Sequence, residues 1–277
     1  MTTSDAFKAL YDTVARLRAP DGCEWDREQT PSTLRGALIE ETYECLEAID
    51  NNDPAHINEE LGDLYLLATM ISFMHEEENK FSVADVLTKV NEKLIRRHPH
   101  VFGDVKVKDT AEILDNWEAI KIEQEGRKPK DSLLDEVSAA LPPMERSFKL
   151  QKKAAKVGFD WQDTEGVIEK IKEEFEEVKI AINSKKSSHG GTEAQSFNKL
   201  YKSLDQAIEE ELGDLLFSVI NLCRFLKVEP SAALRRTNSK FIDRFKYVEK
   251  KMKEAGHQMK KENLCIMEKY WNEAKEI

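Results

Sequence analysis

The sequence has little of what breaks helices or builds small cross-linked folds. Its 277 residues include only 11 glycines and 8 prolines, and its four cysteines are scattered without a C-x-x-C pair. Such cysteines predict neither a disulfide framework nor a zinc site. No apolar run approaches the roughly 18–20 residues that span a bilayer, and the polar N-terminus lacks the apolar core of a signal peptide. We therefore expect a cytoplasmic protein that does not enter a membrane.

An excess of positive charge is also missing. The chain has 53 acidic against 42 basic residues, a formal net charge of −11, although charged residues make up 34% of it. Proteins that bind nucleic acid non-specifically neutralise backbone phosphates with Lys and Arg. The acidic balance therefore argues against a general nucleic-acid surface, and we expect no nucleic-acid partner.

Apolar residues recur at spacings of three and four, which is the period of an amphipathic helix. Residues 34–49 and 57–74 show this spacing most clearly, and no long segment alternates as a strand would. Start signals agree, with Ser32 or Thr33 before the first helix and Asp53-Pro54 before the second. The sequence therefore predicts an all-α fold.

An acidic pattern, E-x-x-E followed by E-L-G-D-L, is present twice. The first copy contains Glu41 and Glu44, then Glu60 and Asp63. The matching acids of the second copy are Glu174, Glu177, Glu211 and Asp214. Residues three apart lie on one face of a helix, so two such helices facing each other would gather four carboxylates. Bare carboxylates would repel or take up protons there. We therefore predict a hard dication, Mg²⁺ with Mn²⁺ as a substitute.

Cationic and aromatic pairs follow the acids in both copies. Lys93 and Arg97 are one helical turn apart, as are Trp117 and Lys121. Their counterparts in the second copy are Lys240, Arg244, Trp271 and Lys275. Lys and Arg could take phosphate charge that the metal does not reach, and Trp could stack on a base. Because Mg²⁺ often binds together with substrate phosphates, this order of motifs indicates a polyphosphate substrate.

The ordered recurrence of these motifs predicts a duplicated domain rather than a solenoid of short repeats. We place the copies at residues 1–130 and 131–277, divided by a charged stretch with Gly and Pro. The second copy carries an insertion near 183–203 whose polar, Gly/Ser-rich composition predicts a flexible loop. A single acidic, cationic or Trp motif would most often be structural. Their joint recurrence favours function.

These residues closely resemble the MazG family of nucleoside triphosphate pyrophosphohydrolases over nearly the whole chain. The segments that carry the resemblance are Gly22-Cys23-Glu24-Trp25-Asp26, Glu40-Glu41-Thr42-Tyr43-Glu44, Glu60-Leu61-Gly62-Asp63-Leu64, Arg96-Arg97-His98-Pro99-His100-Val101-Phe102 and Val157-Gly158-Phe159-Asp160-Trp161. The resemblance implies tandem domains like four-helix bundles, a homodimer, and Mg²⁺-dependent hydrolysis of a nucleoside triphosphate (NTP or dNTP) between its α and β phosphates. The products would be a nucleoside monophosphate and pyrophosphate.

The resemblance also implies a role for each motif. The eight repeated acids would be metal ligands, and Glu210 would orient or deprotonate the attacking water, with Glu59 as its N-terminal counterpart. The cations and tryptophans named above would hold the nucleotide. In this family the C-terminal domain is the better-established catalytic one, but the N-terminal motifs here are complete. Two alternatives to a broad hydrolase stay open: a narrower hydrolase of dNTPs or (p)ppGpp, and a nucleotide-binding regulatory module with one or both sites silent.

Overall fold

The computed structural model of the chain divides into two compact units, Met1–Pro129 and Lys130–Ile277. The structure describes residues 1–123, 131–187 and 194–276, with the backbone alone at residues 111, 114, 115, 118, 121–123, 186, 187 and 194–203. All regular structure within these ranges is helical, which confirms the predicted all-α class. The predicted domain boundary at 130/131 adjoins residues 124–130, which are outside the described residues.

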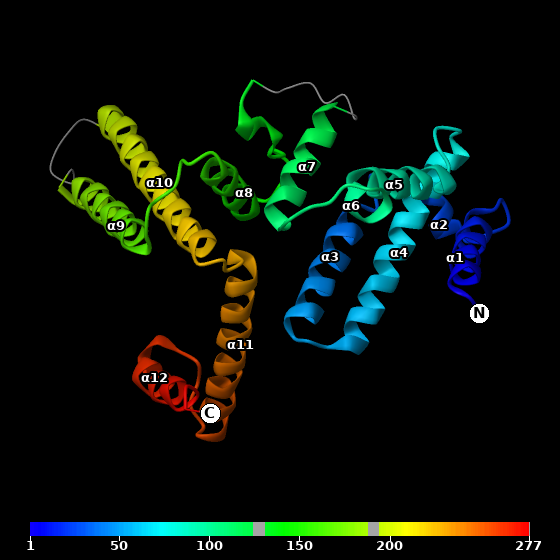
Figure 1. Cartoon of the computed structure of the whole chain (residues 1–277). Helices are drawn as coiled ribbons and strands as arrows, with labels where there is room; N and C mark the ends of the chain where they lie inside the picture. The colour runs from blue at the N-terminus through cyan, green and yellow to red at the C-terminus, as the bar shows by residue number, and fades with distance from the viewer. Residues whose placement is uncertain (124–130, 188–193, 277) are drawn as a thin grey trace. The chain divides into compact units, whose positions relative to one another are not determined.

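The N-terminal unit is built around the antiparallel helices α3 and α4, which lie side by side (Figure 1). Helix α1 packs on α4, and the short helix α2 follows it; α5 contacts α4, α6 and α7. The bounds are α1 Thr3–Arg18, α2 Glu24–Glu28, α3 Arg35–Asp50, α4 Pro54–Glu77, α5 Val83–Arg97, α6 Pro99–Phe102 and α7 Thr110–Glu123.

The C-terminal unit repeats this plan with the longer hairpin of α9 and α10 (Figure 1). Helix α8 packs on α10 as α1 packs on α4, and α11 contacts α8, α10 and α12. The bounds are η1 Leu133–Glu136, α8 Pro143–Lys156, α9 Thr164–Ser187, α10 Ala194–Phe225, α11 Pro230–Glu254, η2 Lys261–Asn263 and α12 Leu264–Glu273.

The two acidic helices of the N-terminal unit begin differently. Helix α4 begins as predicted, with Pro54 in its first turn and the Asp53 carboxylate accepting hydrogen bonds from two backbone N–H groups. The prediction that Ser32 or Thr33 caps α3 was wrong. Leu34 holds the cap position, and its apolar side chain makes no cap hydrogen bond. The Thr33 hydroxyl does not cap the helix because it is used within the preceding turn, where it accepts from the Thr30 N–H.

A buried cluster of apolar side chains joins α1, α3 and α4. Val14, Leu34, Leu67, Met70 and Met74 are each at most 7% exposed and pack together. Burying side chains of this size stabilises a fold by roughly 1.5–3 kcal/mol each. This core holds α4, and with it the second acidic segment, against α1.

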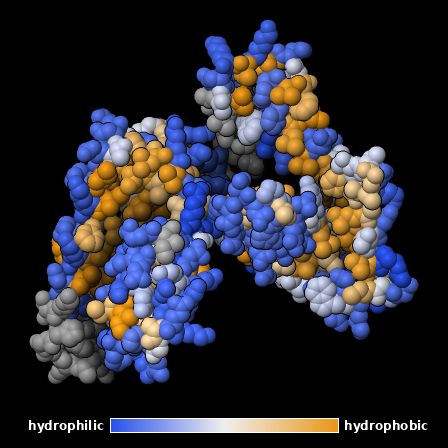
Figure 2. Space-filling model, turned by 90° about the horizontal axis from the view of Figure 1, so that it is seen from below, coloured by the Kyte–Doolittle hydropathy of each residue, from blue (hydrophilic) through white to orange (hydrophobic). Residues whose placement is uncertain are grey.

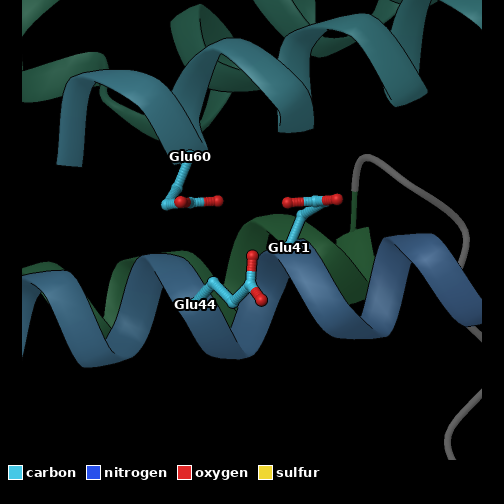
Figure 3. Close-up of side chains that lie close together, drawn as sticks. All are labelled: Glu41, Glu44 and Glu60. Carbon is cyan, nitrogen blue, oxygen red and sulfur yellow. The ribbon is translucent and has the colours of Figure 1, made fainter. Parts of the chain in front are cut away.

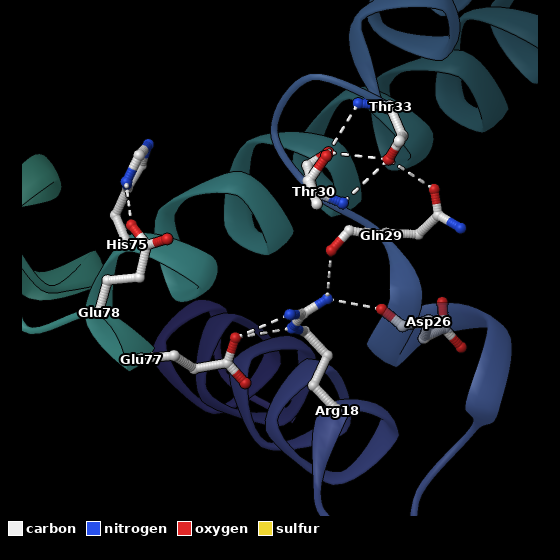
Figure 4. Close-up of polar contacts among 8 residues, drawn as sticks. All are labelled: Arg18, Asp26, Gln29, Thr30, Thr33, His75, Glu77 and Glu78. Atoms are coloured by element: carbon white, nitrogen blue, oxygen red, sulfur yellow. Dashed lines mark hydrogen bonds and ion pairs between the residues drawn. The ribbon is translucent and has the colours of Figure 1, made fainter.

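An arginine fixes the turn that leads into α3. The Arg18 guanidinium pairs with Glu77 at the end of α4 and donates to the carbonyl oxygens of Asp26 and Gln29 (Figure 4). The C-terminal unit has a similar ion pair with the charges exchanged. The acid, Asp160, lies in the turn before α9, and the base, Arg224, lies on α10. Each pair ties the G-x-[DE]-W turn to the second helix of the hairpin.

The predicted loop over 183–203 is largely helical in its described part. Helix α9 continues to Ser187 and α10 begins at Ala194, while residues 188–193 are outside the described residues. The polar, Gly-rich composition does not prevent the two helices from extending into this stretch. No described helix is long and apolar enough to cross a membrane.

Candidate metal centre

Three carboxylates meet between α3 and α4 in the N-terminal unit. Glu41 and Glu44 project from α3 toward Glu60, which projects from α4 (Figure 3). One carboxylate oxygen of each lies within 4.8 Å of the other two. The i, i+3 spacing places the first two acids on one face of α3, and the antiparallel hairpin brings the third opposite them. The fourth predicted ligand, Asp63, is close enough to Glu41 to raise its pKa.

The acids of the N-terminal cluster outnumber the basic groups that pair with them. Burial is the largest cause that raises the pKa of Glu41 to about 7, followed by a hydrogen bond with Glu60 and by the charges of Asp63 and Glu44. Glu60 is only 5% exposed. Its Oε1 lies 2.8 Å from His56 Nε2, whereas its Oε2 is buried without a hydrogen-bond partner. An orphaned buried carboxylate oxygen fits the donor set of a hard dication.

The C-terminal unit forms the equivalent cluster between α9 and α10. Glu174, Glu211 and Asp214 each place a carboxylate oxygen within 4.8 Å of the other two. The pKa of Glu177 is raised, chiefly by a hydrogen bond with Glu174 and further by the charge of Glu211, so it belongs to the same neighbourhood. Lys170 Nζ lies 2.6 Å from Glu174 Oε1, and this hydrogen bond is the main cause that raises the lysine's pKa.

The two candidate general bases are next to cluster acids in the sequence. Glu59 and Glu210 are both exposed, and each precedes a cluster acid by one residue. The Glu210 carboxylate accepts a hydrogen bond from Gln206 at 3.2 Å. Neither glutamate is among the three residues that meet in its unit.

The predicted cationic and aromatic residues of the N-terminal unit lie on α5 and α7, and neither helix contacts α3 within the described residues. Lys93 is exposed and Arg97 is partly buried at the end of α5. Trp117 packs edge-on against the His98 ring, with ring centroids 5.0 Å apart, and its Nε1 is buried without a partner. The side chain of Lys121 is outside the described residues.

The C-terminal counterparts lie on α11 and α12. Lys240 is exposed and Arg244 partly buried. Trp271 packs against Phe241, with ring centroids 5.1 Å apart, and the Lys275 ammonium donates to Asn272. In the described chain α9 contacts no helix except α10, and α12 contacts only α11 and η2. Within the described residues, α5 and α11 thus contact the second helix of their acidic hairpin, whereas α7 and α12, which carry the tryptophans, contact neither hairpin helix.

Two basic residues in the clusters were missed by the sequence reasoning. His56 and Lys170 each precede a buried cluster glutamate by four residues, and this i, i+4 spacing was the signal that could have found them. They are not equivalent, because aligning the two copies on their acids places Ala37 opposite Lys170 and Ala207 opposite His56. Each site thus has one built-in basic group, supplied from a different helix.

The fold and the clusters together define a class: an all-α protein in which paired antiparallel helices present carboxylates suited to a divalent cation. Comparison with known proteins makes the assignment specific. The model of the MazG nucleotide pyrophosphohydrolase domain matches twice, at residues 29–102 and 162–249. The chain belongs to the MazG family, as the resemblance of its motifs predicted.

Relatives of similar length support this assignment. The chain is 40% identical to the nucleoside triphosphate pyrophosphohydrolase/pyrophosphatase MazG of Thermotoga maritima, over 97% of this chain and 95% of that protein. It is 38% identical to the nucleoside triphosphate pyrophosphohydrolase of Escherichia coli K12, over 96% and 95%. The uncharacterized protein YabN of Bacillus subtilis is 43% identical over 98% of this chain and 52% of its own length.

Proposed function

We propose that this chain hydrolyses nucleoside triphosphates between the α and β phosphates, releasing a nucleoside monophosphate and pyrophosphate. The observation that carries the proposal is the acidic cluster between paired helices, formed twice in a chain of the MazG family. Relatives that match nearly their whole length are named nucleoside triphosphate pyrophosphohydrolases. The proposal places the enzyme in the cytoplasm and gives it a broad range of NTP and dNTP substrates.

The carboxylates of each cluster would hold Mg²⁺, with Mn²⁺ as a substitute. Glu174, Glu211 and Asp214, with Glu177 beside them, form the C-terminal set. The N-terminal set is Glu41, Glu44, Glu60 and Asp63. Bound Mg²⁺ would polarise the phosphates and lower the pKa of a coordinated water. Oxygen-only ligands and the orphaned Glu60 Oε2 favour a hard cation over zinc or copper.

The exposed glutamates next to the clusters would handle the water. Glu210, and Glu59 in the other unit, would accept a proton from the attacking water as a general base. The Gln206 amide, which donates to the Glu210 carboxylate, would hold that carboxylate in place. Lys240 and Arg244 would neutralise charge on the pyrophosphate as it leaves, while Trp271 and Lys275 would contact the nucleoside. The N-terminal counterparts would be Lys93, Arg97, Trp117 and Lys121.

A homodimer is part of the proposal, because the tryptophan-bearing helices α7 and α12 contact neither helix of their acidic hairpin within the described chain. The hairpin helices also carry large exposed apolar side chains, among them Ile180 at 64% and Leu216 at 62%. Figure 2 shows apolar patches interrupting the hydrophilic surface. Monomeric proteins rarely expose large contiguous apolar patches. A second copy packed on this hairpin would cover that surface and could supply a tryptophan to the site.

Pyrophosphate release by glutamine variants tests the assignment of roles. Glu210→Gln should lower kcat by about 10²–10⁴-fold, the usual contribution of a general base, while Mg²⁺-dependent nucleotide binding is kept. Glu176→Gln is the matched control, because Glu176 lies between two cluster acids yet pairs with Lys179 at 2.6 Å; its kcat should not change. If activity survives Glu210→Gln and disappears in Glu59→Gln, the N-terminal unit is the working site instead.

A substrate panel separates the remaining functions. Turnover of all NTPs and dNTPs with Mg²⁺ supports the broad hydrolase, and turnover of dNTPs or (p)ppGpp alone would narrow it. Nucleotide binding that requires Mg²⁺ but yields no pyrophosphate would instead indicate the regulatory module.

A further inference from the structure

A cavity of about 630 Å³ adjoins the acidic cluster of the C-terminal unit. It is bounded by α8, α9, α10 and the G-F-D-W turn, and two cluster acids, Glu174 and Asp214, lie on its wall. Phe159 and Trp161 offer it aromatic rings. Its volume falls within the roughly 300–1,000 Å³ of small-molecule pockets. Trp271, the residue predicted to stack on a base, lies on α12, which contacts none of these helices.

One wall of this cavity carries an unsatisfied buried acceptor. Gln151, the buried residue of α8, is 7% exposed. Its Nε2 donates to the Phe217 carbonyl oxygen at 2.8 Å, and its Oε1 has no hydrogen-bond partner. The amide cannot turn over, because its oxygen would then face the carbonyl oxygen of Phe217. A buried acceptor left unpaired destabilises a protein, so such a group calls for a partner.

The N-terminal unit fills the corresponding region with apolar side chains. Aligning the copies on E-L-G-D places Leu67, Met70 and Phe73 of α4 opposite Ser218, Asn221 and Arg224 of α10. Leu67 and Met70 are buried in the core, with Phe73 packed against it. The buried residue of α1 in that core is the apolar Val14, whereas the buried residue of α8 is the polar Gln151. The polar cavity wall is therefore particular to the C-terminal copy.

We propose that this cavity binds the base of the nucleotide and that Gln151 determines base preference; this rests on the proposed function. The Oε1 atom accepts a hydrogen bond from an exocyclic amino group, as on adenine or cytosine. One of the two N–H groups of the Gln151 amide is already bonded to Phe217, and Oε1 is the buried atom left without a partner to meet the base.

Substrate pairs that differ by one amino group test the proposal. The first pair is ATP and purine riboside triphosphate; the second is CTP and its analogue without the 4-amino group. For the full chain, kcat/KM should favour the amino-bearing member of at least one pair by roughly 10–100-fold, the usual consequence of leaving a buried polar group unpaired. Gln151→Leu should reduce this ratio to within about threefold, by slowing the amino-bearing substrate.

Gln29→Leu is the matched control, because the Gln29 amide also donates to a backbone carbonyl but its Oε1 is already paired with the Thr33 hydroxyl (Figure 4). In Gln29→Leu the ratio of kcat/KM values within each substrate pair should equal that of the parent chain. Equal kcat/KM values within both pairs in the parent chain would overturn the proposal, and this result does not depend on whether Gln151→Leu folds. A preference for the amino-bearing substrate that persists in Gln151→Leu would also overturn it. Calorimetric titration of the same pairs with Mg²⁺ measures base preference even in a chain that releases no pyrophosphate, which separates failure of this inference from failure of the proposed function.

Discussion

At the scale of single residues, the buried carboxylates of the acidic clusters destabilise the folded state. Glu60 and Glu174 are each 5% exposed, and burying a carboxylate is unfavourable unless it is paired. His56 and Lys170 give each of them one partner. A single partner does not balance three or four carboxylates. The remaining negative charge is what a divalent cation would neutralise.

The raised pKa of Glu41 gives a prediction on pH. Its pKa is about 7 in the fold against an ordinary 4.5, so between these values the folded state holds a proton that the unfolded state has lost. Stability from this group is therefore present below pH 4.5 and falls as the pH rises toward 7. In EDTA, the Tm of the chain should drop between pH 5 and pH 8 by more than the Tm of Glu41→Gln.

Mg²⁺ should reduce that drop, because a bound cation favours the ionised carboxylate and stabilises only the folded state. Glu47→Gln on the exposed side of α3 is the control, and its Tm should follow the parent chain. If the Tm of the parent chain and of Glu41→Gln depended on pH in the same way, the raised pKa of Glu41 in the acidic cluster would be contradicted.

The spacing of the acids in the sequence was enough to predict that they meet. A spacing of three fixes a face of one helix, and a short connection makes two helices antiparallel neighbours, so Glu41, Glu44 and Glu60 could be placed together without coordinates. Gln151 could not be found in this way. It belongs to no repeated motif, and its importance depends on a carbonyl of α10, 66 residues further along.

At the scale of elements, the position of each acidic hairpin depends on the turn that precedes it. Gly22 begins the G-C-E-W turn and lies against the end of α1. A Cβ there would be 2.6 Å from the Arg16 carbonyl oxygen and closer still to that of Leu17. Position 22 therefore requires glycine because a larger residue would clash with α1. Position 158 in the other copy favours glycine for another reason, because its φ is +87°, a backbone conformation that other residues rarely adopt.

Gly22→Ala should therefore destabilise the N-terminal unit by about 1–3 kcal/mol, the range for overpacked sites, as measured by urea denaturation. Gly36→Ala in α3 is the control, because a Cβ there meets nothing within 4 Å. The control should be neutral or stabilised by up to about 1 kcal/mol. Equal stability of both variants would show that the turn does not hold the chain as described.

The existence of the helices could be predicted, but their limits and neighbours less well. Leu34, not Ser32 or Thr33, caps α3, because local turn hydrogen bonds compete for the hydroxyl of Thr33. Helices α9 and α10 extend past the limits that composition indicated. Which helix the cation-bearing α11 contacts depends on tertiary packing, and helical periodicity carries no information on that choice.

At the scale of the whole molecule, the chain is two copies of one plan that differ in what lies beside the acids. The C-terminal copy has a cavity next to its cluster, with Gln151, Ser218 and Asn221 among its lining residues. The N-terminal copy has an apolar core at the positions that correspond to Ser218 and Asn221. Both keep carboxylates in contact between their hairpin helices. The duplication thus preserves an acidic cluster twice, and we propose a nucleoside pocket beside the C-terminal one.

The proposed homodimer predicts a molar mass of twice 31.9 kDa in size-exclusion chromatography with light scattering. Leu216→Asp, at a residue 62% exposed on α10, should shift the chain toward the monomer, because a buried charge without a partner opposes association. Lys152→Asp at an exposed position of α8 should leave the mass unchanged. A monomeric parent chain would contradict the homodimer and would remove the second copy as a source of tryptophan for the site.

The central claim is hydrolysis of a nucleoside triphosphate between its α and β phosphates at a carboxylate-held cation. Its most direct test is ³¹P NMR of the products formed from ATP by the full chain, with Mg²⁺ and with EDTA. We predict AMP and pyrophosphate in Mg²⁺ and no turnover in EDTA. Formation of ADP and inorganic phosphate, or unchanged turnover in EDTA, would contradict the claim.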